Sequence, residues 1–243
     1  MTAIGIIGSQ GRMGQTIRLE LAAQDIGCAG GVDRSEGDLP QLVGASDVLI
    51  DFSAPDALKS NLEACMVAGK PIVIGTTGLE VAHHHLIDAA AQNIAVLQTG
   101  NTSLGVNLLS ALIEETGRRL GDDWDIEIVE MHHRHKIDAP SGTALLFGEA
   151  AARGRDIELA QMSERGRNGI TGPRKRGTIG FASLRGGSVA GDHSAIFATD
   201  GESITLSHRA ENRVIFARGA IKAARWLASQ APGRYDMKNV LGL

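Results

Sequence analysis

The side chains best suited to acid–base chemistry lie close together in the middle of the chain. Residues 127–144 read EIVEMHHRHKIDAPSGTA, which brings His132, His133 and Lys136 near a Ser-Gly-Thr sequence at 141–143. Imidazole and ammonium groups bind anions and transfer protons. The N–H groups at the start of a helix bind carboxylates. The segment therefore indicates an acid–base site for a small substrate that carries two negative charges.

Two other interpretations compete for this segment. One is a metal site, but His132 and His133 point to opposite faces if they lie in a strand. No cysteine or close carboxylate completes a ligand set, so we predict no metal. The other is a basic turn that is merely solvated, and the residues alone leave it open.

A strand and a helix must position these groups. Residues 124–131 alternate in hydrophobicity as a strand does, and the strand delivers His132 at its end. Residues 140–152 have a helical pattern, with Pro140 near the start and Gly154 beyond the end. The candidate site therefore lies where a strand ends and a helix begins.

A second candidate site lies near the N-terminus. Residues 8–14 read GSQGRMG and follow a short apolar run at 3–7, and a helical pattern comes after them. Glycines at such positions let the backbone approach a pyrophosphate, whose charge the helix N-terminus attracts. We therefore predict a dinucleotide-binding loop, and the alternative is an ordinary glycine-rich turn.

An acidic residue after the second expected strand supports the dinucleotide interpretation. Asp33 lies roughly 20 residues beyond the loop, where an acid that binds the ribose is expected. Arg34 follows directly and can pair with a 2′-phosphate, so we predict that both NADH and NADPH bind. Gly75, Thr76 and Thr77 follow a later strand, and are either a contact to the nicotinamide end or a simple turn.

The first hundred residues alternate between strands and helices. Strands are expected at 3–7, 27–32, 47–52, 71–74 and 94–98, and helices after residue 14 and at 57–68 and 80–92. This order predicts βαβ units and a parallel sheet of the Rossmann type.

The pattern changes near residues 101–103. A long helix is expected at 103–120, a polar loop at 161–177 and a last helix at 214–228. Strands expected at 178–184, 189–198 and 203–208 are separated by glycine-containing turns, which predicts an antiparallel meander. The predicted fold class is α/β, with a Rossmann-type parallel-sheet domain and a second α+β domain whose sheet is mostly antiparallel.

Composition argues against several other classes of protein. The 243 residues carry a net charge of −4 and only 3% aromatic residues, which disfavours a nucleic-acid partner. Two cysteines cannot form a disulfide framework. The longest stretch without charge, residues 89–113, contains a polar cluster and does not predict a membrane span. We expect a cytoplasmic protein without a signal peptide or a membrane partner.

These motifs together resemble the 4-hydroxy-tetrahydrodipicolinate reductases, also called dihydrodipicolinate reductases, of bacterial lysine and diaminopimelate biosynthesis. The similarity covers nearly the whole chain and is most specific at 132–144, where the pattern HHxxKxDAPSGTA is intact. The glycine loop and residues 51–55, 75–78 and 177–181 also match family features. The resemblance implies an enzyme that reduces a cyclic dicarboxylate to tetrahydrodipicolinate with NADH or NADPH.

The resemblance also implies roles for individual residues. His132 matches the acid–base histidine of the family and Lys136 its proton donor. His133, Gly142 and Thr143 match its contacts to the substrate carboxylates. The cofactor contacts fall on Gly8, Ser9, Gln10, Gly11, Arg12, Met13, Asp33, Arg34, Gly75, Thr76, Thr77, Thr99, Gly100, Asn101 and Thr102.

Domain organisation follows from the same resemblance. The family is usually a homotetramer built through its second domain, and its last helix returns to the nucleotide domain. We therefore expect a dinucleotide-binding domain of residues 1–103 and 213–243, and a substrate-binding and oligomerisation domain of residues 104–212.

Two features depart from the family pattern. The segment after Asp33 is short, and Thr102 replaces a usual aromatic residue. A competing hypothesis is an NAD(P)-binding sensor or regulator that kept the fold without reductase activity. The intact acid–base segment argues against it.

Overall fold

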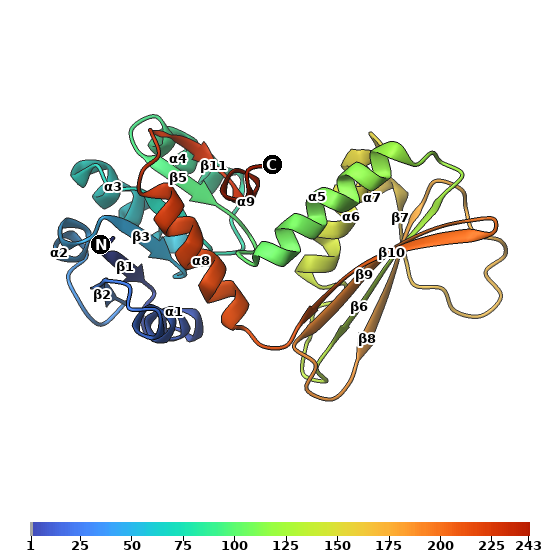
Figure 1. The fold of residues 1–243 in the computed structure, drawn as a ribbon, viewed down its shortest axis with the longest axis horizontal. Coiled ribbons are helices and arrows are strands. Elements are labelled where there is room, and N and C mark those ends of the chain that lie inside the picture. Colours follow the sequence, from blue (N-terminus) through green and yellow to red (C-terminus); the bar gives the residue numbers. More distant parts are fainter. Residues whose placement is uncertain (1) are drawn as a thin grey trace. The chain divides into compact units, whose positions relative to one another are not determined.

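The computed structural model describes residues 2–243 and divides the chain into two compact units. One unit contains the residues up to Leu104 together with Val214–Leu243. The other unit contains Gly105–Arg213. The elements of both units are labelled in Figure 1.

The first unit contains a six-stranded sheet whose neighbouring strands are all parallel. Its strands are β1 (Ile4–Ile7), β2 (Cys28–Val32), β3 (Val48–Asp51), β4 (Ile72–Ile74), β5 (Ala95–Gln98) and β11 (Gly233–Tyr235). They lie in the order β11-β5-β4-β3-β1-β2, which confirms the predicted Rossmann-type sheet.

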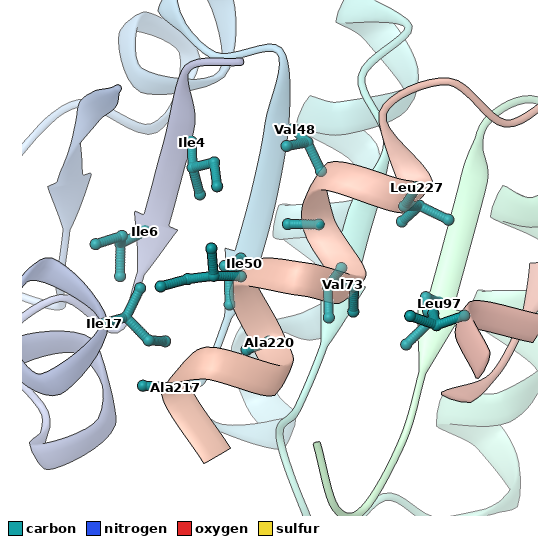
Figure 2. Close-up of a cluster of buried hydrophobic side chains, with 14 of the residues drawn as sticks. Ile4, Ile6, Ile17, Val48, Ile50, Val73, Leu97, Ala217, Ala220 and Leu227 are labelled. Atoms are coloured by element: carbon teal, nitrogen blue, oxygen red, sulfur yellow. The ribbon is translucent and has the colours of Figure 1, made fainter. Parts of the chain in front are cut away.

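Helices cover both faces of this sheet. They are α1 (Arg12–Ala23), α2 (Leu39–Ala45), α3 (Leu58–Ala68), α4 (Val81–Ala91), α8 (Val214–Leu227) and α9 (Met237–Leu241), with a 3₁₀ turn at Pro55–Ala57. Successive strand residues point to opposite faces, so the apolar runs divide between two cores. On one face Ile4, Ile50 and Val73 pack against α1 and α8, and Figure 2 shows Ala220 and Leu227 of α8 over them. The residues between them in the strands pack against α2, α3 and α4.

The structure adds short elements that the sequence patterns did not indicate. They are α2, β11 and α9 in the first unit, and α7 (Leu159–Met162) and β7 (Ser163–Arg165) in the second. Each spans at most seven residues, which is too short to establish a clear hydrophobic period. Part of the segment predicted as a loop from residue 161 is therefore ordered as α7 and β7.

The second unit contains a five-stranded sheet in the order β10-β9-β6-β8-β7. Its longer strands are β6 (Asp125–His132), β8 (Ile179–Arg185), β9 (Gly191–Thr199) and β10 (Glu202–Ala210). The long pairs β9–β10 and β6–β9 are antiparallel, whereas β8 pairs in parallel with β6 and β7. The predicted fold class is confirmed, and this sheet is mixed.

The predicted antiparallel meander is wrong in one respect. Strands β9 and β10 form a hairpin, but β8 and β9 do not pair, because β6 lies between them. Local turn chemistry indicated a hairpin at 186–187, but β6, which comes earlier in the chain, is inserted there. Tertiary pairing therefore overrides a local turn signal.

Two helices cover one face of this second sheet. They are α5 (Leu104–Arg119) and α6 (Gly142–Gly154). Phe147 of α6 is fully buried with Ile126, Ile128 and Phe197 of the sheet. Because the first turn of α6 lies next to the end of β6, this core positions the residues of the acid–base segment.

A close contact fixes α8 within the first unit. The Thr102 hydroxyl donates a hydrogen bond to the Phe216 carbonyl at 2.7 Å. A Cβ atom at Gly219 would lie 1.7 Å from the Thr102 carbonyl oxygen. The backbone of residue 219 fixes the position of that Cβ, and the Thr102 carbonyl is itself backbone, so no side-chain rotation relieves the clash.

We therefore expect Gly219→Ala to lower the free energy of unfolding by about 2–3 kcal/mol. Gly44→Ala in α2 is the matched control, because no atom lies within 4 Å of a Cβ there. The control should raise stability by up to about 1 kcal/mol, since alanine favours a helix over glycine. Urea denaturation at one protein concentration measures both values, and equal effects of the two substitutions would contradict the close packing.

Candidate active site

The end of β6 carries two polar side chains into the protein interior. Alternate residues of this strand are buried, so Glu130 and His132 lie on the same face as Ile126 and Ile128. Only 1% of Glu130 and 9% of His132 is exposed. A buried carboxylate requires hydrogen-bonding partners, and the neighbouring elements supply them.

The Glu130 carboxylate has partners on both oxygens. Oε2 lies 2.5 Å from His132 Nδ1 and accepts a hydrogen bond from Arg185 Nη1 at 2.9 Å. Oε1 accepts from Arg185 Nη2 at 2.8 Å and from the Ser141 N–H at 3.3 Å. Burial raises the pKa of Glu130, but the hydrogen bonds from Arg185 and His132 outweigh it and lower the pKa overall. Glu130 is therefore a carboxylate at neutral pH.

A second histidine, His193 of β9, packs against His132. The two ring centroids are 4.9 Å apart in an edge-to-face arrangement. His193 Nε2 lies 2.9 Å from Ser141 Oγ, within hydrogen-bonding distance, and the same Oγ accepts from the Ala144 N–H at 3.2 Å. Burial, and then the neighbouring His132, lower the pKa of His193 to about 4. A neutral imidazole thus holds the serine that caps the N-terminus of α6.

Strand register brings this cluster together. His132 is the parallel partner of Arg185 on β8, and Glu130 is the antiparallel partner of His193 on β9. The central position of β6 therefore gives its buried face one charged neighbour and one aromatic neighbour.

The second ring nitrogen of His132 faces Gly191. A Cβ atom at Gly191 would lie 3.0 Å from His132 Nε2 and 3.3 Å from His193 Cε1. Because glycine has no side chain there, space remains beside Nε2.

Lys136 lies in the turn that follows β6. Its Nζ donates to both carboxylate oxygens of Asp138, at 2.7 and 2.8 Å, and its side chain is 19% exposed. This hydrogen bond lowers the pKa of Asp138. Arg185 Nη2 donates to the Asp138 carbonyl at 2.6 Å. The guanidinium that pairs with Glu130 therefore also holds the turn that carries Lys136.

The residues predicted to bind the substrate carboxylates lie next to this cluster. Gly142 and Thr143 are the first two residues of α6, directly after the Ser141 cap. No atom lies within 4 Å of a Cβ built on Gly142. The His133 N–H donates to the Val189 carbonyl at 2.8 Å, and burial lowers the pKa of the His133 imidazole. The structure thus gathers the predicted catalytic and carboxylate-binding residues within the second unit.

The first unit has a cavity of about 600 Å³ at the glycine loop. Five predicted cofactor residues line it: Gly8, Gln10, Gly11, Asp33 and Arg34. The lining also includes Phe52, Ser53 and Ala54, from the segment 51–55 that matches family features, and residues that the sequence analysis did not single out, among them Gly37, Leu39, Ala57 and Asn61. The carboxyl ends of β1, β2 and β3 therefore open onto one cavity, as in nucleotide-binding parallel sheets.

Two glycines allow the loop to pack this closely. Gly8 has a φ of +81°, and a Cβ there would lie 2.5 Å from the Phe52 carbonyl oxygen. A Cβ at Gly14 would lie 2.3 Å from the Gly8 carbonyl oxygen. Gly11 caps α1 without a side-chain hydrogen bond, and N–H groups at the start of a helix attract anions. This cradle fits a dinucleotide pyrophosphate.

Asp33 holds the loop from the end of β2. Its Oδ2 accepts from the Gln10 N–H at 3.0 Å, and its Oδ1 accepts from the Arg34 N–H at 2.8 Å. Gln10 Nε2 also donates to Glu36 Oε2 at 2.6 Å. Two carboxylates thus lie on the short turn after β2.

The other predicted cofactor residues do not line this cavity. They are Ser9, Arg12, Met13, Gly75, Thr76, Thr77, Thr99, Gly100, Asn101 and Thr102. The Thr76 hydroxyl lies 3.3 Å from the buried Asp51 carboxylate, and the Thr102 hydroxyl binds the Phe216 carbonyl. The hydroxyls of Thr76 and Thr102 therefore have partners within the fold. The cofactor contacts of these ten residues, like those of the five that line the cavity, stay predictions.

Within residues 2–243, no group of three or more His, Cys, Asp or Glu side chains is arranged to hold a metal ion. None of the described helices is both long and apolar enough to cross a membrane.

Family models match both halves of the chain. The model described as "Dihydrodipicolinate reductase, N-terminus" matches residues 2–102, and the one described as "Dihydrodipicolinate reductase, C-terminus" matches residues 105–241. The chain belongs to the dihydrodipicolinate reductase family. This confirms the resemblance found in the motifs.

Individual members of the dihydrodipicolinate reductase family are similar to this protein along nearly the whole chain. The 4-hydroxy-tetrahydrodipicolinate reductase of Zymomonas mobilis is 58% identical, covering 99% of this chain and 97% of the relative. That of Brucella melitensis is 50% identical over 98% of each. A dipicolinate-bound dihydrodipicolinate reductase from Paenisporosarcina sp. TG-14 has a TM-score of 0.74 at 22% identity, covering 98% of this chain and 99% of that one. The last of these comparisons shows the fold alone.

The side chains around His132 at the end of β6 form what we call the acid–base cluster. The sequence analysis did not predict three of its members: Glu130, Arg185 and His193. A signal for Glu130 was present, because residues two apart in a strand share a face. No comparable signal exists for Arg185 or His193, since their places depend on the order of β6, β8 and β9.

The neutral state of His193 predicts a pH-dependent stability. The pKa of His193 is 6.5 in the unfolded chain and about 4 in the folded protein. As the pH falls, the unfolded chain therefore binds a proton at this residue before the folded protein does. Stability is therefore complete above pH 6.5 and falls as the pH drops from 6.5 toward 4. At pH 5 the titration of His193 alone should lower the free energy of unfolding by about 2 kcal/mol.

We expect wild type to lose about 2 kcal/mol more than His193→Gln between pH 7.5 and pH 5, because glutamine can still hydrogen-bond with Ser141 Oγ but does not titrate. Urea titrations at both pH values measure the difference. His85→Gln, at an exposed position on α4, is the matched control and should behave as wild type. Equal losses in wild type and His193→Gln would refute the buried neutral imidazole.

Proposed function

We propose that this chain reduces 4-hydroxy-tetrahydrodipicolinate to tetrahydrodipicolinate with NADH or NADPH, in the diaminopimelate route of lysine biosynthesis. Membership of the reductase family over both halves of the chain supports the reaction. The observation that carries the proposal is the cluster at the end of β6. It combines an ordered histidine, a lysine and the start of α6 within one unit.

The substrate class follows from the charges of this cluster. A cyclic dicarboxylate needs two anion sites, and His133 with the first N–H groups of Gly142 and Thr143 would supply them. The related protein from Paenisporosarcina sp. TG-14 is described as bound to dipicolinate, which is a ring with two carboxylates. Holding both carboxylates fixes the orientation of the ring and so lowers the entropic part of the barrier.

The proton chemistry falls to His132 and Lys136. For the product to be tetrahydrodipicolinate, the 4-hydroxyl group of the substrate must leave as water, which gives a more conjugated ring. When bound, the reduced nicotinamide would supply a hydride to an electron-poor carbon of that ring, and a proton must then reach the neighbouring position. His132 has its Nδ1 occupied by Glu130, so Nε2 is the atom that exchanges a proton beside Gly191. Lys136 is held by Asp138 through a pair that can rearrange when an anionic ligand binds.

The cofactor site is proposed at the glycine loop. Residues 8–13 would hold the pyrophosphate, and Asp33 would accept from the ribose 2′-hydroxyl. Arg34, on the cavity wall, would pair with a 2′-phosphate, which supports use of both NADH and NADPH. Residues 75–77 and 99–102 are proposed for the nicotinamide end.

The domain roles are proposed on the same basis. Residues 1–103 and 213–243 would bind the dinucleotide, and residues 104–212 would bind substrate and form a homotetramer. The structure divides the chain at Leu104 and Arg213. The cytoplasm is the proposed location. A sensor without activity is not favoured, because His132 is ordered by a buried ion pair that a binding module does not need.

A coupled assay tests the function. Aspartate semialdehyde and pyruvate are condensed in place by the preceding synthase, and absorbance of NADH or NADPH is followed. We expect oxidation that depends on both the synthase and this protein. His132→Gln should lower kcat about 100-fold or more without changing NADH affinity. If protein that is shown to bind NADH gives no oxidation, the proposed reductase activity is refuted, and the competing hypothesis of an NAD(P)-binding sensor is favoured instead.

The cofactor site predicts a change in selectivity. Asp33→Ala should raise the Kd of NADH about tenfold, because a hydrogen bond to a charged acceptor is lost. The Kd of NADPH should rise less, since its 2′-phosphate cannot donate to that carboxylate. Titration of protein fluorescence or calorimetry measures both constants. Glu63→Ala, an exposed acid on α3, is the control for net charge. An unchanged ratio of the two constants would remove Asp33 from the ribose site.

A further inference from the structure

We propose that Glu130, held by Arg185, is a positioning residue that fixes the tautomer and orientation of His132 and ties it to the start of α6. This inference rests on the proposed function for its kinetic consequence, and on geometry alone for the tautomer.

The first step is that the Glu130 carboxylate links both parts of the site. Oε2 contacts His132 Nδ1 at 2.5 Å, and Oε1 accepts from the Ser141 N–H at 3.3 Å. One rigid group therefore sets the distance between the acid–base histidine and the helix N-terminus proposed for the carboxylates. Displacement of this group would move both together.

The second step concerns the charge. The two N–H groups of Arg185 bind the two oxygens of Glu130 in parallel, at 2.8 and 2.9 Å. Such a paired arrangement keeps the acid ionised although it is buried. An ionised carboxylate only accepts hydrogen bonds, so the proton between it and His132 belongs to Nδ1. Nε2 is then the nitrogen that gains or loses a proton during reaction.

The third step concerns the surroundings of His132. Glu130 approaches from its own strand, Arg185 from β8, and the neutral His193 packs edge-on from β9. Lys136 follows in the turn after β6. Among these groups, Glu130 is the acid in contact with the imidazole of His132.

A comparison within the same strand separates this role from a structural ion pair. Glu127 is also ion-paired with arginines, at 2.8 Å to Arg167 and 2.9 Å to Arg174. It lies on the opposite face of β6 from Glu130. Glu127→Gln therefore makes the same chemical change in the same strand without touching the acid–base cluster.

The direct test is the tautomer of His132 in wild-type protein. With ¹⁵N-labelled histidine, long-range proton–nitrogen couplings identify which ring nitrogen carries the proton. We expect the Nδ1–H form, lost or mixed in Glu130→Gln. A wild-type ring protonated only at Nε2 would overturn the proposal. The measurement on wild type needs neither reductase activity nor a folded variant.

The kinetic test compares Glu130→Gln with Glu127→Gln. We expect kcat to fall about 10- to 100-fold in Glu130→Gln, with NADH affinity within twofold of wild type. Glu127→Gln should keep the wild-type kcat.

Two outcomes would overturn the proposal: a Glu130→Gln enzyme with wild-type kcat, or equal losses of kcat in both variants. If wild type itself lacks reductase activity, the proposed function fails, and the tautomer measurement still decides the positioning role.

Discussion

A carboxylate buried at the end of β6 has to be compensated, and Arg185 of β8 is the group that does so. Without the guanidinium, desolvation would favour protonated Glu130, which could not hold His132 with Nδ1 as a donor. Arg185 also binds the Asp138 carbonyl, so one side chain orders the turn as well as the acid. The acid–base site is thus organised around a single ion pair, and β6 supplies the position for it.

The proposed anion sites of the two units are built in a similar way. In the first, Gly11 caps α1, and glycines let the loop approach the sheet closely. In the second, Ser141 caps α6 and is itself held by the neutral His193. Both sites present the start of a helix beside the end of a parallel or mixed sheet, where N–H groups and the helix dipole favour negative charge. The two helix starts differ in the side chain beside them. In the first unit it is Asp33, proposed for a ribose hydroxyl, and in the second it is His132, proposed for proton transfer.

Much of the fold follows from hydrophobic periodicity. The alternating strands and helices of the first unit were predictable because each apolar run is bounded by glycine or polar residues. Short elements such as α2, β7 and β11 were not predicted, because a few residues show no clear hydrophobic period. The strand order of the second sheet was not predicted either. A turn between β8 and β9 indicated a hairpin, but burial of Ile126 and Ile128 against α6 favours β6 at the centre.

The sequence by itself determined which chemistry this protein can do. His132, Lys136 and the Ser-Gly-Thr start of α6 are contiguous, so local structure alone brings them near one another. The glycine loop and Asp33 are likewise separated by only one helix and one strand. Only the tertiary structure decided how His132 is held. Arg185 and His193 reach it through the pairing of β6 with β8 and β9, and such long-range register depends on packing the whole sheet against α5 and α6.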